Sequence, residues 1–230
     1  MKALAVGLIL LGLVTSTFAA GKADKAKLEV RIRSLTTKFE ALQQKPELRI
    51  PAENLRKAQG IILLDRTKAG FIFAFQGGSG VAMVKDPKSQ KWGPVAFYSA
   101  TEASLGFQIG GQQSFVVILL MDANATKRLT ESTVDFSGEA RGTAGDTSAG
   151  QEGKMTNKGD AVLVYAERKG LYGGAAIKGG EVSPDLEANQ LYYGEFLTVK
   201  DILFDQKVKP TLNAEELAKR LTEHSKANTK

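Results

Sequence analysis

The sequence predicts an α+β fold, with a strongly curved, mainly antiparallel sheet flanked by an N-terminal amphipathic helix and a C-terminal helix. Residues 22–45 repeat apolar side chains at helical spacing, and residues 213–224 also look helical. Between them lie short runs of β-branched and aromatic residues, separated by glycine. Several runs are apolar on both faces. A sheet built from them must either be backed by helices or curl into a barrel.

The N-terminus has the pattern of a secretory signal peptide, which we assign to residues 1–19. Lys2 precedes an apolar run from Ala3 to Val14, and small residues follow. At about a dozen residues, this run is shorter than the roughly 18 to 20 that span a bilayer core. We therefore expect cleavage after Ala19 and export to the periplasm or the cell exterior, with peripheral membrane association as an option. A retained N-terminal anchor is the alternative.

The chain contains no cysteine, which excludes disulfides, cysteine-based metal sites and a lipid-modified cysteine. Any membrane contact must therefore be non-covalent. The net charge is +6, and the surplus lies near the N-terminus, because residues 21–68 contain twelve Lys and Arg against six Asp and Glu. Such a surplus favours phospholipid headgroups or nucleic acid, and export argues for lipid.

Residues 20–45 are expected to form the amphipathic helix, which Pro46 ends. Basic residues follow one border of its apolar stripe, three of them at seven-residue spacing. This flank can orient the helix on a membrane or against a partner helix. Packing of the stripe on the domain core is the alternative. The stripe consists of Leu28, Ile32, Leu35, Phe39 and Leu42, and the basic row of Lys27, Arg31, Lys38 and Lys45.

The remaining elements follow from branched, aromatic and glycine residues. Residues 114–121 are apolar on both faces and predict a central, fully covered strand. The glycines from Gly77 to Gly80 predict a hairpin turn, and residues 142–159 fit either a loop or weak edge strands. The other expected strands are 61–64, 71–75, 81–84, 95–98, 134–141 and 161–167, and the other expected helices are 51–59, 124–131 and 185–193.

From Ile50 to Phe204 the chain resembles the SYLF domain along nearly its whole length. Several separated motifs occur in the order that this family shows. One segment departs from the family pattern, since residues 149–154 read Ala-Gly-Gln-Glu-Gly-Lys where Ala-Gly-Pro-x-Gly-Arg is usual. The similar segments are Ile50-Pro51, Ala69-Gly70-Phe71, Gly77-Gly78-Ser79-Gly80-Val81, Trp92-Gly93-Pro94, Leu105-Gly106-Phe107-Gln108-Ile109-Gly110, residues 165–174, Asn189, Tyr192-Tyr193-Gly194 and Asp201-Ile202-Leu203.

The resemblance implies a phospholipid-binding domain. Some eukaryotic relatives also bind actin, which is an implausible partner for an exported chain, whereas bacterial relatives are exported or lipoproteins. Lys68, beside Ala69-Gly70, and Arg168-Lys169, beside Gly170, are further candidates for contact with lipid phosphate, where backbone amides approach closely. The alternative is that these three residues are ordinary charged turn residues.

Catalytic and cofactor patterns are missing from the sequence. His224 is the single histidine, so a Ser-His-Asp triad and a histidine metal site are not expected. Asp201 and Asp205 share a helical face, which is usually solvated. No phosphate-binding glycine loop occurs, and aromatic residues do not alternate with the basic cluster as nucleic-acid binding would require. We expect a protein that is not an enzyme and needs no cofactor or metal.

The sequence thus predicts four segments: a signal peptide at 1–19, the amphipathic helix at 20–45, a SYLF-like lipid-binding domain at 46–210, and a C-terminal helix and tail at 211–230. The expected function is non-catalytic binding of anionic phospholipid at the periplasmic or extracellular side. An exported scaffold for protein–protein interaction, without a lipid ligand, is the alternative.

Overall fold

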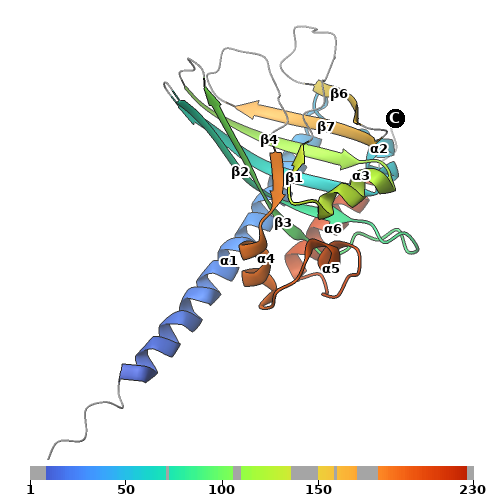
Figure 1. Cartoon of the computed structure of the whole chain (residues 1–230). Helices are drawn as coiled ribbons and strands as arrows, with labels where there is room; N and C mark the ends of the chain where they lie inside the picture. Colours follow the sequence, from blue (N-terminus) through green and yellow to red (C-terminus); the bar gives the residue numbers. More distant parts are fainter. Residues whose placement is uncertain are drawn as a thin grey trace, which may run out of the picture.

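An antiparallel sheet organises the part of the chain that the computed structural model describes, residues 9–70, 73–105, 110–135, 150–157, 160–169 and 181–226. Eight strands are seen there, in the order β5-β8-β3-β2-β1-β4-β7-β6 (Figure 1). Their bounds are β1 Gly60–Gly70, β2 Phe73–Val84, β3 Ala96–Leu105, β4 Gly110–Leu120, β5 Val134–Asp135, β6 Gly150–Asn157, β7 Asp160–Lys169 and β8 Glu181–Pro184.

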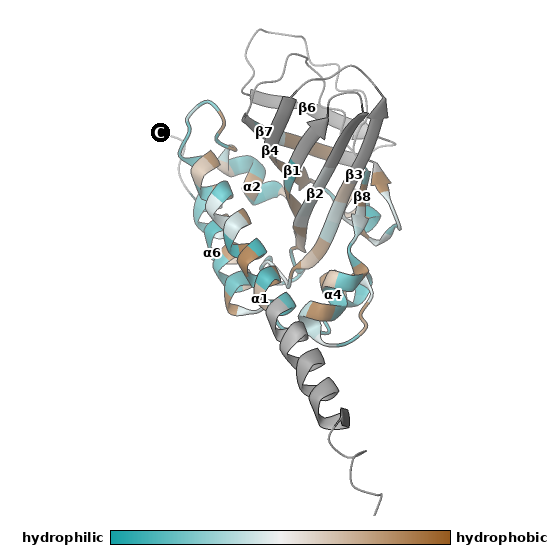
Figure 2. Ribbon diagram, turned by 90° about the vertical axis from the view of Figure 1, so that its left-hand side faces the viewer, coloured by the Kyte–Doolittle hydropathy of each residue, from teal (hydrophilic) through white to brown (hydrophobic). Residues whose placement is uncertain are grey.

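Helices cover both faces of this sheet. One face carries α1 (Ile9–Gln43), α2 (Ala52–Lys57), α4 (Leu186–Tyr193) and α6 (Leu212–Lys226), whose apolar side chains share one core with the sheet. The other face carries α3 (Ala123–Lys127), the short 3₁₀ helix η1 (Arg128–Thr130) and α5 (Val199–Leu203) around a second core. Figure 2 shows α1 and α6 side by side on the first face, so the N-terminal and C-terminal helices pack together.

The apolar run at residues 114–121 forms the covered central strand that the sequence predicts. β4 pairs with β1 on one side and β7 on the other. Val117 and Leu119 belong to the core beneath α1, whereas Ile118 and Leu120 belong to the opposite core. Because both faces of the strand are packed, it needs apolar residues at consecutive positions.

The strong curvature that we expected is wrong, because the sheet is open and does not curl strongly. Its outer strands, β5 and β6, lie at opposite ends of the strand order. The pairings of β1 with β2 and β4 run from Gly60 to Gly70 without a bulge, and bulges are the usual means of bending a sheet. Since helices already cover both faces, closure into a barrel is not needed to bury these strands.

The predicted hairpin at Gly77–Gly80 is also wrong, since these residues lie inside β2 and pair with β1 and β3. The expected strands 71–75 and 81–84 are therefore parts of one strand as far as Phe73–Val84 is described. Close approach of the neighbouring strand explains the glycines. A Cβ atom on Gly80 would lie 2.1 Å from the carbonyl oxygen of Leu63, and one on Gly78 would lie 3.0 Å from that of Asp65.

Most other elements match the prediction, and two short ones were not expected. The helices predicted near residues 51–59, 124–131, 185–193 and 213–224 are present as α2, α3 with η1, α4 and α6. The unexpected elements are β8 and α5. Part of the undecided stretch 142–159 forms β6, which pairs with β7 at the edge of the sheet. Residues 71–72, 106–109, 136–149, 158–159 and 170–180, on which parts of the predicted strands and motifs fall, lie outside the described residues.

Gln151, which replaces the usual proline of the family pattern, lies in β6 opposite Tyr165. A proline cannot donate its backbone nitrogen to such a ladder, so glutamine is compatible with strand pairing here. The register shifts between Glu152 and Lys154, which places Gly153 at a bulge. Within the described ranges, no helix combines the length and the apolarity needed to cross a bilayer.

Candidate functional site

Three residues of the predicted basic row form ion pairs with the rest of the domain: Arg31 and Lys38 on α1, and Lys45 two residues after its end. Lys38 pairs with Asp65 of β1, and Lys45 pairs with Glu167 of β7. Arg31 Nη1 lies 3.8 Å from Asp185 Oδ2, at the start of α4. We call Arg31, Lys38, Lys45 and their three carboxylate partners the ionic seam.

Strand pairing explains how carboxylates come to face the helix at such spacing. Asp65 and Glu167 both pair with Phe115 of β4, so they occupy one row across three strands. Asp185 directly follows β8. Its side chain caps α4 by accepting from the backbone N–H of Ala188 at 3.0 Å. Because α1 crosses the sheet, the basic residues at seven-residue spacing lie next to acidic residues from three separate elements. The seam therefore neutralises three of the four cations in the predicted row.

Arg31 and Lys27 have surroundings that differ from those of Lys38 and Lys45. The guanidinium of Arg31 lies 5.7 Å from the ring centroid of Phe97, an arrangement that favours its charge. Its Nη1 atom is buried and has no hydrogen-bond partner among the described groups. Lys27 instead pairs with Asp24 at 3.0 Å on the exposed side of α1. Lys27 therefore does not belong to the seam.

The apolar stripe of α1 packs on the domain core, as the alternative in the sequence analysis had it. Leu28, Ile32, Leu35, Phe39 and Leu42 all belong to the core beneath the sheet. Burial of each such side chain contributes about 1.5 to 3 kcal/mol. Transfer of this stripe into a membrane would sacrifice roughly 10 kcal/mol of folding energy on that scale. The stripe is thus a structural element in this fold.

The other three predicted residues lie on strands and not in turns. Lys68 of β1 pairs with Gln112 of β4, whereas Arg168 and Lys169 of β7 pair with Ser114 and Gln113. Neighbouring strands lie about 4.8 Å apart, so the backbones of β1 and β7 are roughly 10 Å apart across β4. The register thus brings the three basic residues to the same end of the sheet. We call them the strand-end cluster.

A basic site that the sequence analysis missed surrounds Lys85, at the end of β2. Its ammonium donates to the carbonyl oxygens of Leu55 at 3.1 Å and Arg56 at 2.9 Å, and it lies 4.7 Å from the centroid of the Trp92 ring. Burial lowers the pKa of Lys85 to about 8, whereas the carbonyls and the ring favour its charged form. The sequence gives no signal for this site because α2 and Lys85 are distant along the chain.

The motif around Asn189 and Tyr193 holds α4 on the sheet. The buried Asn189 amide accepts from the Phe97 N–H at 2.8 Å and donates to the Phe97 carbonyl at 3.2 Å. The Tyr193 hydroxyl donates to the carbonyl of Val95, and burial raises the pKa of this tyrosine. These family-like residues therefore position α4 on β3.

The groups that were considered for catalysis are engaged in structural contacts. Asp201 caps α5 through Thr198 and pairs with Lys207, and these bonds hold its pKa below the usual range, with Lys207 as the largest cause. Asp205 pairs with Lys200 at 2.7 Å. His224 Nε2 lies 3.1 Å from Glu40 Oε1. Across the described residues, no group of three or more acidic, histidine or cysteine side chains could hold a metal ion.

Comparison with known families identifies the family to which the chain belongs. Residues 101–224, more than half of the chain, match the family model Ysc84, described as "Las17-binding protein actin regulator". The chain belongs to the Ysc84 family. This is the SYLF-domain family that the sequence motifs resemble.

Curated relatives of this Ysc84-family chain come from animals and yeast. It is 29% identical over 174 residues to human SH3 domain-containing YSC84-like protein 1, covering 75% of this chain and 50% of the relative. It is also 29% identical over 158 residues to LAS seventeen-binding protein 3 of Saccharomyces cerevisiae, covering 67% of this chain and 34% of that protein. The chain thus spans half or less of the length of these two relatives. No solved structure matches it significantly.

Proposed function

We propose that this chain is a non-catalytic protein that binds anionic phospholipid, with the strand-end cluster as its headgroup site. The observation that carries the proposal is the position of Lys68, Arg168 and Lys169 at one end of the sheet, where the register places Lys68 and Arg168 on one face and Lys169 on the opposite face. The resemblance of this domain to lipid-binding SYLF domains supports the same ligand. The ionic seam contributes less, because each of its cations already faces a carboxylate.

The expected strength of such a site follows from its charge. Each basic side chain near an anionic membrane surface contributes about 1 kcal/mol. Three cations therefore supply roughly 3 kcal/mol, or about a hundred-fold in affinity. Because exposed charges are screened within about 8 Å at physiological ionic strength, binding should weaken as salt is raised.

The proposal places this binding on the exported side of a membrane. The leader-like pattern of residues 1–19 supports export, with a mature protein that starts near Ala20 and lies in the periplasm or outside the cell. In that compartment actin is not the partner. The intact mass of the protein recovered from its natural source tests this, since a mass that includes residues 1–19 contradicts cleavage.

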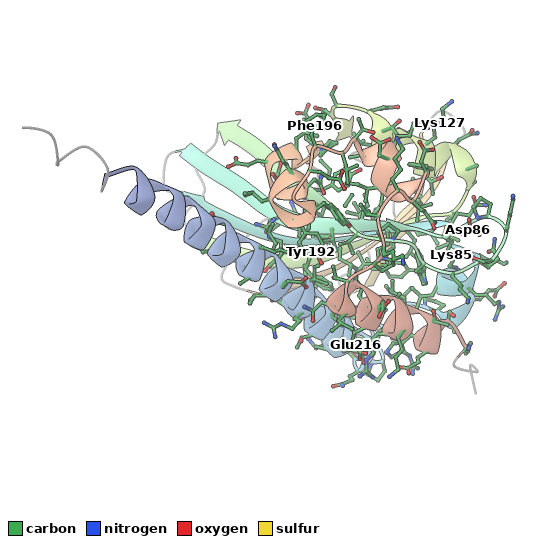
Figure 3. The ribbon with its side chains drawn as sticks, turned by 90° about the horizontal axis from the view of Figure 1, so that it is seen from below. Lys85, Asp86, Lys127, Tyr192, Phe196 and Glu216 are labelled. Carbon is green, nitrogen blue, oxygen red and sulfur yellow. The ribbon has the colours of Figure 1, made fainter. Side chains whose placement is uncertain are left out.

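A second candidate function is a scaffold for protein–protein interaction without a lipid ligand. Apolar side chains exposed on α4 and in the loop behind it favour it: Leu186 is 51% exposed and Phe196 is 67% exposed. Figure 3 shows Phe196 at the surface. The description of the family model, which names a binding protein, is in line with this candidate.

Liposome flotation separates the two functions. We expect the protein to float with vesicles that contain phosphatidylglycerol or phosphatidylserine and to stay behind with pure phosphatidylcholine. The variant Lys68→Glu/Arg168→Glu/Lys169→Glu should lose the contribution of this site, which is about a hundred-fold in affinity where the site acts alone. A matched control, Arg33→Glu/Lys209→Glu/Lys226→Glu, makes the same change in net charge at exposed positions elsewhere. Absence of binding by the wild-type protein would reject the lipid function and leave the scaffold.

A further inference from the structure

A second group of basic residues lies at the end of the sheet where β1 begins, on α2 over one face, on the connection from β2 to β3, and on α3 over the other face. α2 and residues 85–92 together carry five basic residues and two acidic ones. α3 adds Lys127 and touches the start of β1, since a Cβ atom on Gly60 would lie 2.8 Å from Thr126 Cγ2. We call Arg56, Lys85, Lys88, Lys91 and Lys127 the basic end.

The two acidic residues of α2 and the β2–β3 connection offset only part of the positive charge in this region. Glu53 pairs with Lys57 at 2.6 Å. Asp86 accepts from the backbone N–H groups of Ser89 at 2.6 Å and Lys88 at 3.1 Å, and these bonds, led by Ser89, lower its pKa. Asp86 therefore stays charged, and its side chain stabilises the turn by these hydrogen bonds.

Four cations of the basic end are exposed and form no salt bridge among the described residues. Beyond the larger effects of Lys57 and Ser89, Arg56 and Lys88 lie near enough to Glu53 and Asp86 to lower the pKa of these carboxyl groups. Among the residues that the structure describes, Arg56, Lys88, Lys91 and Lys127 take part in no ion pair. The contrast with the ionic seam is direct, because there each cation faces an acidic group from another element. Cations without a salt bridge at one end of a molecule produce the positive potential that attracts an anionic partner.

The basic end is held in place by backbone hydrogen bonds. The connection is closed by Asp86 N–H to the Lys91 carbonyl and by Gly93 N–H to the Val84 carbonyl, both at 2.9 Å. Lys85 joins this connection to the end of α2 through the carbonyls of Leu55 and Arg56. The backbone of the connection that carries Lys85, Lys88 and Lys91 is therefore ordered before any ligand arrives, which reduces the entropic cost of binding.

The basic end and the strand-end cluster lie at opposite ends of the strands. β1 begins at Gly60, next to α2 and α3, and Lys68 lies near its other end. At about 3.3 Å per residue, eight residues separate the two groups by roughly 26 Å along the strand. Figure 3 shows Lys85 and Asp86 side by side and Lys127 apart from them, all toward the end of the molecule away from the N-terminal half of α1. One flat membrane cannot easily contact both groups at once.

We infer that the basic end is a contact surface for anionic phospholipid headgroups, independent of the strand-end cluster. This inference rests on the proposed lipid function and adds a second membrane-facing surface to it. Phosphate groups in a bilayer present a plane of negative charge, which fits exposed cations contributed by separate elements. Single-stranded nucleic acid fits less well, because it needs aromatic rings for stacking, and the Trp92 ring is 7% exposed.

Two surfaces at opposite ends of one domain have a consequence that a single surface lacks. A protein with both can bind one vesicle with each end and so bring vesicles together. We expect wild-type protein to cluster vesicles of phosphatidylcholine with phosphatidylglycerol, as seen by dynamic light scattering. Removal of either basic group should abolish clustering, because the remaining group can hold only one vesicle.

The test compares the variant Arg56→Glu/Lys88→Glu/Lys91→Glu with the strand-end variant and with the control Arg33→Glu/Lys209→Glu/Lys226→Glu. The basic-end variant should lose vesicle clustering but still bind single anionic vesicles through the strand-end cluster, while its melting temperature stays near that of the wild type. A glutamine version of the same three positions provides a second reading if the glutamate version folds poorly. Lys85 is left unchanged because it holds α2.

The outcomes separate this inference from the proposed function. If wild-type protein binds no anionic vesicle, both fail. If it binds and the basic-end variant binds and clusters vesicles like the wild type, the inference is overturned while the lipid function stands. Fluorescence anisotropy with a short RNA and a DNA duplex covers the other polyanion. If the basic-end variant loses nucleic-acid binding but still clusters vesicles like the wild type, the surface belongs to nucleic acid and the inference is overturned.

Discussion

The ionic seam and the basic end contain similar residues and differ in what surrounds them. In the seam, Lys38 and Lys45 reach Asp65 and Glu167, and α1 buries its apolar stripe. At the basic end, Lys88 and Lys91 project from a turn whose acidic residue, Asp86, is bonded to backbone N–H groups. The cations of the seam are paired with carboxylates and help to hold α1 on the sheet. The exposed cations of the basic end form no salt bridge and can attract an anionic partner. A row of cations in a sequence does not tell these two cases apart.

Removal of the Phe39 side chain should have the largest effect on stability. Phe39 is fully buried in the stripe of α1, so Phe39→Ala should lower the free energy of unfolding by about 3 to 5 kcal/mol. Urea denaturation measures the change. Val30→Ala, at a position 52% exposed on the same helix, serves as the control. A small loss for Phe39→Ala, accompanied by weaker vesicle binding, would instead place the stripe on the membrane.

Reversal of charge in the seam should have a smaller effect on stability. Lys38→Glu/Lys45→Glu sets like charges against Asp65 and Glu167, and we expect a loss of roughly 2 kcal/mol for these partly exposed positions. Adding Asp65→Lys and Glu167→Lys restores opposite charges and should recover part of the loss. Thermal denaturation of these variants at low and at high salt provides the measurement. An unchanged melting temperature in the double variant would show that the seam does not hold α1.

The pH dependence of stability tests whether Lys85 is half-buried as the structure shows. This is the smallest of the expected effects. The pKa of Lys85 is about 8 in the folded protein and about 10.4 in an unfolded chain. Because the folded state binds the proton less tightly, stability should rise as the pH increases from about 7 to 9, by about 1 kcal/mol. Lys85→Met should remove this rise, whereas Lys88→Met should keep it. Equal slopes for Lys85→Met and the wild type would contradict the lowered pKa.

At higher pH the buried tyrosines reverse this trend. Burial raises the pKa of Tyr98 and of Tyr193 above the ordinary value near 10. The unfolded chain therefore releases protons that the folded protein keeps, and stability should fall above about pH 10. The Lys85 comparison is best read below that range, where the tyrosines are neutral in both states.

Local patterns predicted those parts of the fold that depend on local periodicity. The spacing of Leu28, Ile32 and Leu35 is enough to predict a helix with one apolar face, because residues three and four apart lie on the same side of any helix. The unbroken apolar run at 114–121 is enough to predict a strand packed on both faces. Neither prediction needs to know which segment does the packing.

The glycines of β2 show where local reasoning fails. Gly77–Gly80 has the composition of a turn, yet the strand continues through it and pairs on both sides. The requirement comes from the carbonyl oxygen of Leu63, which leaves no room for a Cβ atom at Gly80. A contact between two strands, and not the local chain, selects glycine at this position.

An amphipathic N-terminal helix with a basic flank, a covered central strand and the lack of a pattern for common catalysis can all be read from the order of the residues. Only the tertiary structure decided which basic residues are neutralised. The partners of Lys38 and Lys45 lie 27 and 122 residues further along the chain, and the carbonyls that hold Lys85 belong to a separate helix. Charge pairing acts through space over a few ångströms, so it follows from strand register and helix crossing and cannot be inferred from neighbours in the sequence.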